Sequence, residues 1–272
     1  MIKAIIFDFG QTLVDSSEGF RQAEMESQAA IFQDLSINDH DSFMNSYRRI
    51  RKAFHQESNL SRVNIWKAVY QEFSREAPLV ELLKWELAYW QTVERHTKVF
   101  PEVMDVLKTL SNSYEHLGLI TNTQGQTNTH AHRFNNYPSV AAFFSVMIVA
   151  GEDDVPPKPN TRSFIVCLEQ LGVAPDEAIY IGDDWQNDVN GSRDAGLFPI
   201  WLKHQSVNRN YPEVKEDIPV IYTLNELPPY LEKLQQKIQE CGVNLHLQPK
   251  TEDVNFEEDS KLECTMSDDI LL

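Results

Sequence analysis

Short apolar runs that end in polar residues are the feature that most constrains the fold of this chain. Runs rich in Ile, Val and Leu occur at residues 4–7, 117–120, 146–150, 178–181 and 197–202. Runs of this length, bounded by Gly, Asp or Asn, are typical of parallel strands that are buried on both faces. Segments with helical spacing separate them, at residues 102–110, 161–171 and 188–195. Strands that alternate with helices predict a doubly wound α/β parallel sheet.

The alternation is interrupted after the first strand. Four helix-like segments follow one another there without a strand, at residues 20–35, 41–56, 63–75 and 80–96. We therefore predict an α/β core formed by residues 1–15 and 98–235, with an all-helical insertion at residues 16–97. Ligands of open α/β sheets bind beyond the carboxyl ends of the strands. An insertion that leaves the first strand at that end is placed to act as a lid, with hinges near residues 15–18 and 99–101.

The end of the sequence differs in character from the rest. An amphipathic helix predicted at residues 228–240 closes the core. Residues 241–272 are polar, acidic and non-periodic, with EEDS and SDD clusters. This composition predicts a disordered tail.

Charge and cysteine usage limit the classes of partner. The chain has 24 Lys and Arg against 41 Asp and Glu, a formal charge of −17, which repels nucleic acid and anionic membranes. The first apolar run is too short for a signal peptide or a membrane span. Three widely spaced cysteines suggest neither a disulfide framework nor a zinc site, so we expect a cytoplasmic protein. The sequence does not indicate an oligomeric state.

Polar residues stand where the predicted strands end. Asp8 follows the first strand, Thr121 and Asn122 follow the second, and Asp183 follows the fourth, with Asp188 near the start of the next helix. Carboxylates gathered at one edge repel each other unless a cation neutralises them. An oxygen-only cluster suits Mg²⁺, which takes further oxygens from water and phosphate. Taken alone, Asp184 or Asp188 could equally cap a helix, and Thr121 and Asn122 could form an ordinary turn.

Lys158 is a cation in an otherwise acidic chain. It lies between two prolines in the segment PPKPN, at residues 156–160. Proline fixes the backbone, so this loop can present the charge at a defined position. Taken alone, Lys158 could equally be an exposed surface lysine.

Together these residues resemble, in order, spacing and strand-end position, the signature of the haloacid dehalogenase-like hydrolase superfamily. The resemblance covers residues 2–15 and 98–235, and the helical insertion falls where one subgroup of that superfamily carries a cap. The resemblance implies a Rossmann-like core with an inserted helical cap. It also implies a hydrolase, most simply a phosphatase acting on a small phosphorylated metabolite.

The resemblance assigns catalytic roles to Asp8 and Lys158 and substrate-binding roles to Thr121, Asn122 and Lys158. Asp8 would attack phosphorus and form an aspartyl-phosphate, which water then hydrolyses. Thr121 and the backbone near Asn122 would bind the phosphoryl oxygens. Lys158 would neutralise charge on both the nucleophile and the phosphate.

The same resemblance implies the cofactor Mg²⁺ and its ligands. Asp183 and Asp188 would hold the ion. An oxygen of Asp8 and the main-chain carbonyl of Gly10 would complete the protein ligands. The ion would then bridge nucleophile, phosphate and acidic loop.

Gly10 is the point at which this sequence departs from the superfamily's pattern. Phosphatases of this kind usually carry a second aspartate there, as the general acid and base, and such a group is worth about 10² to 10⁴ in rate.

Three alternatives follow from the missing aspartate. One alternative is a phosphatase whose substrate has a good leaving group, or in which Asp15 substitutes. A second is a phosphonatase that forms a Schiff base on Lys52. A third is a catalytically impaired phosphate- and metal-binding regulatory protein. Dehalogenation ranks last, because those relatives work without metal and the metal-binding pattern is retained here.

The predicted insertion contains a basic run and many aromatic residues. The run YRRIRKAF, at residues 47–54, could bind a second anionic group of the substrate or could form a solvated helix face. The aromatic residues recur near helical spacing and predict packing between the insertion's own helices. They are Trp66, Tyr70, Trp85, Tyr89 and Trp90.

Overall fold

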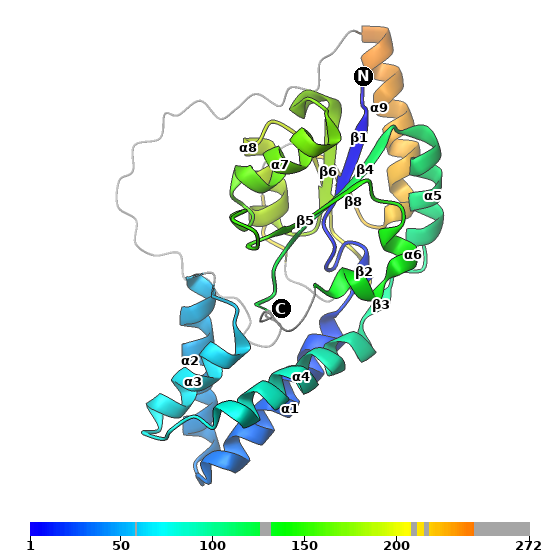
Figure 1. The fold of residues 1–272 in the computed structure, drawn as a ribbon. Helices are drawn as coiled ribbons and strands as arrows, with labels where there is room; N and C mark the ends of the chain where they lie inside the picture. The colour runs from blue at the N-terminus through cyan, green and yellow to red at the C-terminus, as the bar shows by residue number, and fades with distance from the viewer. Residues whose placement is uncertain (58, 126–131, 208–210, 215–217, 242–272) are drawn as a thin grey trace. The chain divides into compact units, whose positions relative to one another are not determined.

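The computed structural model of the 272-residue chain describes residues 1–57, 59–125, 132–207, 211–214 and 218–241 (Figure 1). The chain divides into two compact units. The core unit comprises Met1–Val14, Val99–Thr121 and Ala142 onward, and the helical unit comprises Asp15–Lys98 and Asn122–Ala141. The chain leaves the core unit after Val14 and returns to it at Val99. Both positions lie within one or two residues of the boundaries expected from the sequence. The contribution of Asn122–Ala141 to the helical unit was not anticipated.

A six-stranded sheet forms the centre of the core unit, in the order β5-β4-β1-β6-β7-β8. Its strands are β1 (Ala4–Phe7), β4 (His116–Asn122), β5 (Val146–Ala150), β6 (Ala178–Gly182), β7 (Phe198–Leu202) and β8 (Val220–Ile221). Strand β1 pairs in parallel with both β4 and β6, and β6, β7 and β8 continue the parallel pairing. This confirms the predicted doubly wound α/β fold. The two-residue strand β8 was missed, because so short a segment has no apolar periodicity to detect.

Helices cover the two faces of this sheet. They are α5 (Val103–Ser113), α7 (Thr161–Leu171), α8 (Gly191–Asp194) and α9 (Leu227–Cys241), with the 3-10 turns η2 (Pro175–Glu177) and η4 (Leu224–Glu226). Figure 1 shows α7 and α8 on one side of the sheet and α5 and α9 on the other. Alternate strand residues such as Ile6 and Tyr180 pack against Phe164 and Leu168 of α7. Burying both faces of the strands explains why their sequences are almost continuously apolar.

The segment after β6 is not the single α-helix that was predicted at residues 188–195. It begins as a π-helix, η3 (Trp185–Asn190), and continues as α8 for a single turn. Gly196, the predicted C-terminal glycine, has φ +86°, the left-handed conformation that ends helices. Single π-turns within helical segments are frequent at functional sites.

Four long helices form most of the helical unit: α1 (Ser17–Leu35), α2 (His40–Gln56), α3 (Arg62–Glu72) and α4 (Leu79–His96). The later part of this unit contains the 3-10 turn η1 (Arg133–Asn136) and the short α6 (Pro138–Ala141). Asp39 and Ser61 accept backbone N–H groups at the starts of α2 and α3, as capping residues do. The aromatic residues noted in the sequence belong to this unit's own apolar core, which confirms the packing interpretation.

Two short strands lie where the chain leaves the core unit after Val14 and where it returns at Val99. Strands β2 (Val14–Asp15) and β3 (Lys98–Val99) form a separate two-stranded sheet. Among the described residues, no helix is both long enough and apolar enough to cross a membrane. The predicted acidic tail lies outside the described residues from residue 242 onward.

Candidate active site

The register of the sheet brings three predicted site residues to one edge. Phe7 of β1 is level with Leu119 of β4 and Ile181 of β6. Asp8, Thr121 and Asp183 therefore follow within one or two residues at the carboxyl ends of three adjacent strands. All three are buried, with exposed fractions of 7%, 3% and 3%.

Lys158 is buried among these groups, not exposed at the surface. Its Nζ donates hydrogen bonds to Oδ1 of Asp8 at 2.7 Å and to Oδ1 of Asp188 at 2.6 Å. It also donates to the main-chain carbonyl of Ile120 at 3.1 Å. The lysine thus joins the loop after β5 to the ends of β1 and β4 and to the π-helix. Nothing in the local sequence around PPKPN specifies these partners.

The pKa values of Lys158 and Asp188 are shifted because these charged groups are buried next to one another. Burial alone lowers the pKa of Lys158, but the carboxylates of Asp188 and Asp8 outweigh it and raise that pKa above its usual value. Burial raises the pKa of Asp188 to about 6, against the lowering effect of Lys158 and with the support of Asp8 and Asp184. Lys158 is therefore charged at neutral pH, and Asp188 is held in an environment that opposes its negative charge.

The residues fit a divalent cation. Asp8, Asp183 and Asp188 each offer a carboxylate oxygen, and these oxygens lie within 4.8 Å of one another. Three carboxylates and the Lys158 ammonium leave a formal charge of −3 + 1 = −2 in a buried setting. Carboxylates this close repel one another, and an oxygen-only donor set favours a hard cation such as Mg²⁺.

Gly182 makes room for one of these carboxylates. A Cβ atom at Gly182 would lie 2.3 Å from Cγ of Asp188 and 2.4 Å from its Oδ2. The same Oδ2 accepts a hydrogen bond from the backbone N–H of Asp184 at 2.9 Å. Asp184 itself caps η3 by accepting the N–H of Asn187 at 2.7 Å. Of the two aspartates, Asp184 is therefore the capping residue, whereas Asp188 accepts a hydrogen bond from Lys158.

The remaining predicted residues lie at the boundary of the core unit. Gly10 is half-buried and forms an isolated bridge with Val14, and its φ is outside the left-handed region. Asn122 is the last residue of β4 and belongs to the helical unit. Asp15, the suggested replacement for the missing acid, also belongs to the helical unit. Its Oδ1 accepts hydrogen bonds from the backbone N–H and the hydroxyl of Ser17.

Tyr180 is a site residue that the sequence analysis missed. Its hydroxyl lies 2.9 Å from Nζ of Lys158, 3.1 Å from Oδ1 of Asp188 and 3.2 Å from the carbonyl of Ile120. A tyrosine within the strand AIYIG, predicted to be buried on both faces, was the available signal, because a buried hydroxyl requires a partner.

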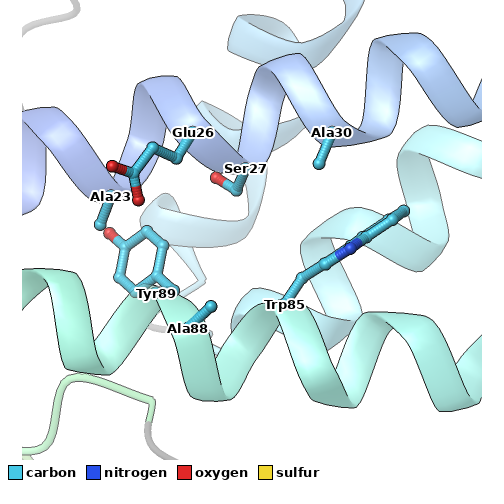
Figure 2. A pocket seen from close by; sticks show the side chains of 7 residues that line it. All are labelled: Ala23, Glu26, Ser27, Ala30, Trp85, Ala88 and Tyr89. Atoms are coloured by element: carbon cyan, nitrogen blue, oxygen red, sulfur yellow. The ribbon is translucent and has the colours of Figure 1, made fainter.

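A small cavity lies elsewhere, within the helical unit between α1 and α4. Figure 2 shows its lining, which consists of Ala23, Glu26, Ser27, Ala30, Trp85, Ala88 and Tyr89. Its volume is about 60 Å³. Ligand pockets usually measure roughly 300 Å³ or more. None of the predicted site residues lines this cavity, so we do not assign it a substrate.

Comparison with known proteins identifies the family. Residues 5–202 match the model of a family described as haloacid dehalogenase-like hydrolase. The chain belongs to this family. It is therefore a hydrolase, as the strand-end motifs predicted.

Curated relatives of known activity align over most of the chain. A glyceraldehyde 3-phosphate phosphatase from Methanopyrus kandleri is 25% identical over 224 residues, covering 80% of this chain and 91% of the relative. A phosphoglycolate phosphatase from Salmonella typhi is 27% identical over 245 residues, covering 85% and 92%.

Solved structures share the fold. A 2-haloacid dehalogenase from Pseudomonas syringae pv. Tomato is 21% identical with a TM-score of 0.61, covering 86% of this chain and all of the other. A haloacid dehalogenase-superfamily phosphatase from Thermococcus onnurineus is 23% identical with a TM-score of 0.57, covering 85% and 98%.

Proposed function

We propose that this protein is a Mg²⁺-dependent phosphatase that hydrolyses a small phosphorylated metabolite through an aspartyl-phosphate on Asp8. The observation that carries the proposal is the buried cluster in which Lys158 bridges Asp8 and Asp188, with Asp183 at the adjacent strand end. The phosphatase activities of the two curated relatives support it.

The chain's own residues account for most of the chemistry. Lys158 donates to Oδ1 of Asp8, which holds the carboxylate in one orientation and leaves Oδ2 to form the bond with phosphorus. The ammonium of Lys158 also offsets the negative charge that the phosphoryl group brings. Thr121, buried at the end of β4, supplies a hydroxyl for a phosphoryl oxygen. This attack breaks the bond between phosphorus and the leaving oxygen, which departs as an anion and takes a proton from water. A second water then attacks phosphorus, releasing phosphate and restoring the carboxylate.

Mg²⁺ would be held by Asp8, Asp183, Asp188 and the carbonyl of Gly10. When bound, it supplies positive charge that draws the phosphate toward the nucleophile. The surrounding carboxylates fit it because their formal charge, with Lys158 included, is −2.

The glycine at position 10 narrows the class of substrate. Asp15, with Oδ1 bound to Ser17, offers no evident replacement for a general acid. A substrate whose leaving group needs little protonation therefore suits the site best. Lys52, the residue required by the phosphonatase alternative, is exposed on α2, and no contact of its side chain with the described residues favours a Schiff base.

The test is release of p-nitrophenolate from p-nitrophenyl phosphate, whose leaving group needs little acid assistance. We expect turnover with Mg²⁺, none with EDTA, and none in Asp8→Asn. Asp194→Asn, which changes an exposed aspartate of the same unit, is the matched control and should keep full activity. An Asp8→Asn variant as active as the wild type would refute the nucleophile. A folded wild type that binds phosphate without turnover would favour the regulatory alternative.

A further inference from the structure

A buried tryptophan of the core unit contacts the loop that carries Asp183. Trp201 of β7 is 2% exposed, and its indole Nε1 donates a hydrogen bond to the main-chain carbonyl of Asp183 at 2.9 Å. The pairing between β6 and β7 ends at this level, where Gly182 is opposite Trp201. The backbone N–H of Trp201 is directed to the other side, where it donates to the carbonyl of Pro219. The indole therefore supplies a hydrogen bond to Asp183 just beyond the end of the sheet ladder.

The peptide group between Asp183 and Asp184 is hydrogen-bonded at both ends. Its carbonyl accepts the indole N–H of Trp201, and its N–H donates to Oδ2 of Asp188 at 2.9 Å. A peptide group is planar, so fixing the direction of its carbonyl also fixes the direction of its N–H. Hydrogen bonds linked in this way polarise and strengthen one another. Through one peptide group, Trp201 thus acts on the backbone of Asp183 and on the carboxylate of Asp188.

The ring of Trp201 is itself held by its neighbours. The ring centroid of Trp185, the first residue of η3, lies 4.8 Å away with an interplanar angle of 55°, and that of Tyr211 lies 5.8 Å away at 82°. Nζ of Lys203 lies 3.9 Å from the centre of the Trp201 ring, where the negative face of an indole attracts a cation. These contacts restrict rotation of the ring, so its N–H points in a defined direction.

We infer that Trp201 is a positioning residue of the metal site, whose indole N–H holds Asp183 and Asp188 in the arrangement that binds a divalent cation. It acts through the peptide group between Asp183 and Asp184. Groups that hydrogen-bond to metal ligands commonly change metal affinity by about 10- to 100-fold when they are removed. Asp183 and Asp188 are ligands of Mg²⁺ in the proposed function, so the inference rests on that function and deepens it.

Calorimetric titration of Mg²⁺ without substrate tests the inference independently of turnover. Trp201→Phe keeps an aromatic ring and removes the donor, so the dissociation constant for Mg²⁺ should rise about 10-fold or more. Trp201→His, studied at pH 8, keeps an N–H at the equivalent position of its five-membered ring and removes the fused ring. It should bind Mg²⁺ more tightly than Trp201→Phe, although it loses more packing. Urea unfolding in EDTA measures the stability of each variant separately.

Trp185→Phe is the matched control, since it changes the neighbouring ring of the same cluster, and within the described residues the Trp185 indole makes no hydrogen bond to Asp183 or Asp188. Its Mg²⁺ affinity should equal that of the wild type. Equal affinities in wild type and Trp201→Phe, or equal weakening in the two phenylalanine variants, would overturn the inference. A wild type that binds no Mg²⁺ would overturn it together with the proposed metal site. Mg²⁺ binding without p-nitrophenyl phosphate turnover would refute the phosphatase alone.

A second measurement uses the wild type and decides the matter if Trp201→Phe does not fold. In protein labelled with ¹⁵N-tryptophan, the five indole signals are assigned with phenylalanine variants at the other four tryptophans. Mg²⁺ should shift the Trp201 indole signal and slow its exchange with solvent. The indole of Trp66, which donates to the hydroxyl of Tyr47 in the helical unit, should not respond. A Trp201 signal that is insensitive to saturating Mg²⁺ would overturn the inference.

Discussion

The two units pair their buried charges differently. In the core unit, Asp8, Asp183 and Asp188 each bring a carboxylate oxygen within 4.8 Å of the others, and Lys158 pairs with Asp8 and Asp188. In the helical unit, Glu24 of α1 forms an ion pair with Arg51 of α2, and Arg62 of α3 also lowers its pKa. Carboxylates gathered so closely favour a bound cation, whereas a carboxylate that already faces cations does not. The comparison teaches that the buried charges of the core unit suit a metal ion, whereas Glu24 and its arginines join the helices of the helical unit.

The largest effect is expected from removing the compensating cation of the core unit. Lys158→Met removes the ammonium that pairs with Asp8 and Asp188, which should destabilise the fold by roughly 3–5 kcal/mol in EDTA. Mg²⁺ should restore part of this loss, because it neutralises the same carboxylates. Urea unfolding with and without Mg²⁺ measures both effects. Lys108→Met, at an exposed position of α5, is the control. A Lys158→Met variant as stable as the wild type in EDTA would contradict the charge account.

A second test restores the acid that the sequence lacks. The backbone of Gly10 lies outside the left-handed region, so an aspartate can adopt its conformation. Gly10→Asp should raise kcat on alkyl phosphates by about 10²-fold, the lower end of the range for a general acid. Turnover of p-nitrophenyl phosphate should change much less, since its leaving group needs little protonation. An equal change for both substrates would show that position 10 does not act on the leaving group.

The smallest effect concerns pH and the helical unit. The arginines hold the pKa of Glu24 below its usual value, so its contribution to stability is present at neutral pH and is lost as pH falls through that lowered pKa. Glu24→Gln should therefore destabilise the protein at pH 7 by about 1–3 kcal/mol, and the difference from wild type should shrink in acid. Unfolding free energies of both proteins across pH measure this. A difference that is constant with pH would exclude an ionic role for Glu24.

Much of the core could be predicted from sequence because its signals are local. The apolar runs that form β1 and β6 and the polar residues that end them, Asp8 and Asp183, are adjacent in the chain, so the strand-end placement follows directly. The partners of Lys158 could not be derived in this way, because its contacts with Asp8 lie 150 residues apart. The π-helix was missed because residues 185–190 carry no pattern that distinguishes it from an α-helix.

The helical unit was predicted less completely for a related reason. Its four helices and aromatic core follow from periodicity, but the burial of Arg62 depends on packing against Tyr89 and Trp90 from another helix. A single arginine after a serine at the start of a helix looks like any exposed residue in sequence. The addition of residues 122–141 to this unit depends on contacts such as that between Gly125 and Leu60, which are far apart in the chain.

The most direct test of the central claim, that the core's buried negative charge binds a divalent cation, is calorimetric titration of Mg²⁺ into the wild type and Asp183→Asn. The account predicts a binding isotherm for the wild type and a large loss of affinity in the variant, because one buried carboxylate ligand and one unit of charge are removed. The exposed-site variant Asp194→Asn should bind as the wild type does. Equal Mg²⁺ affinity in wild type and Asp183→Asn would contradict the account.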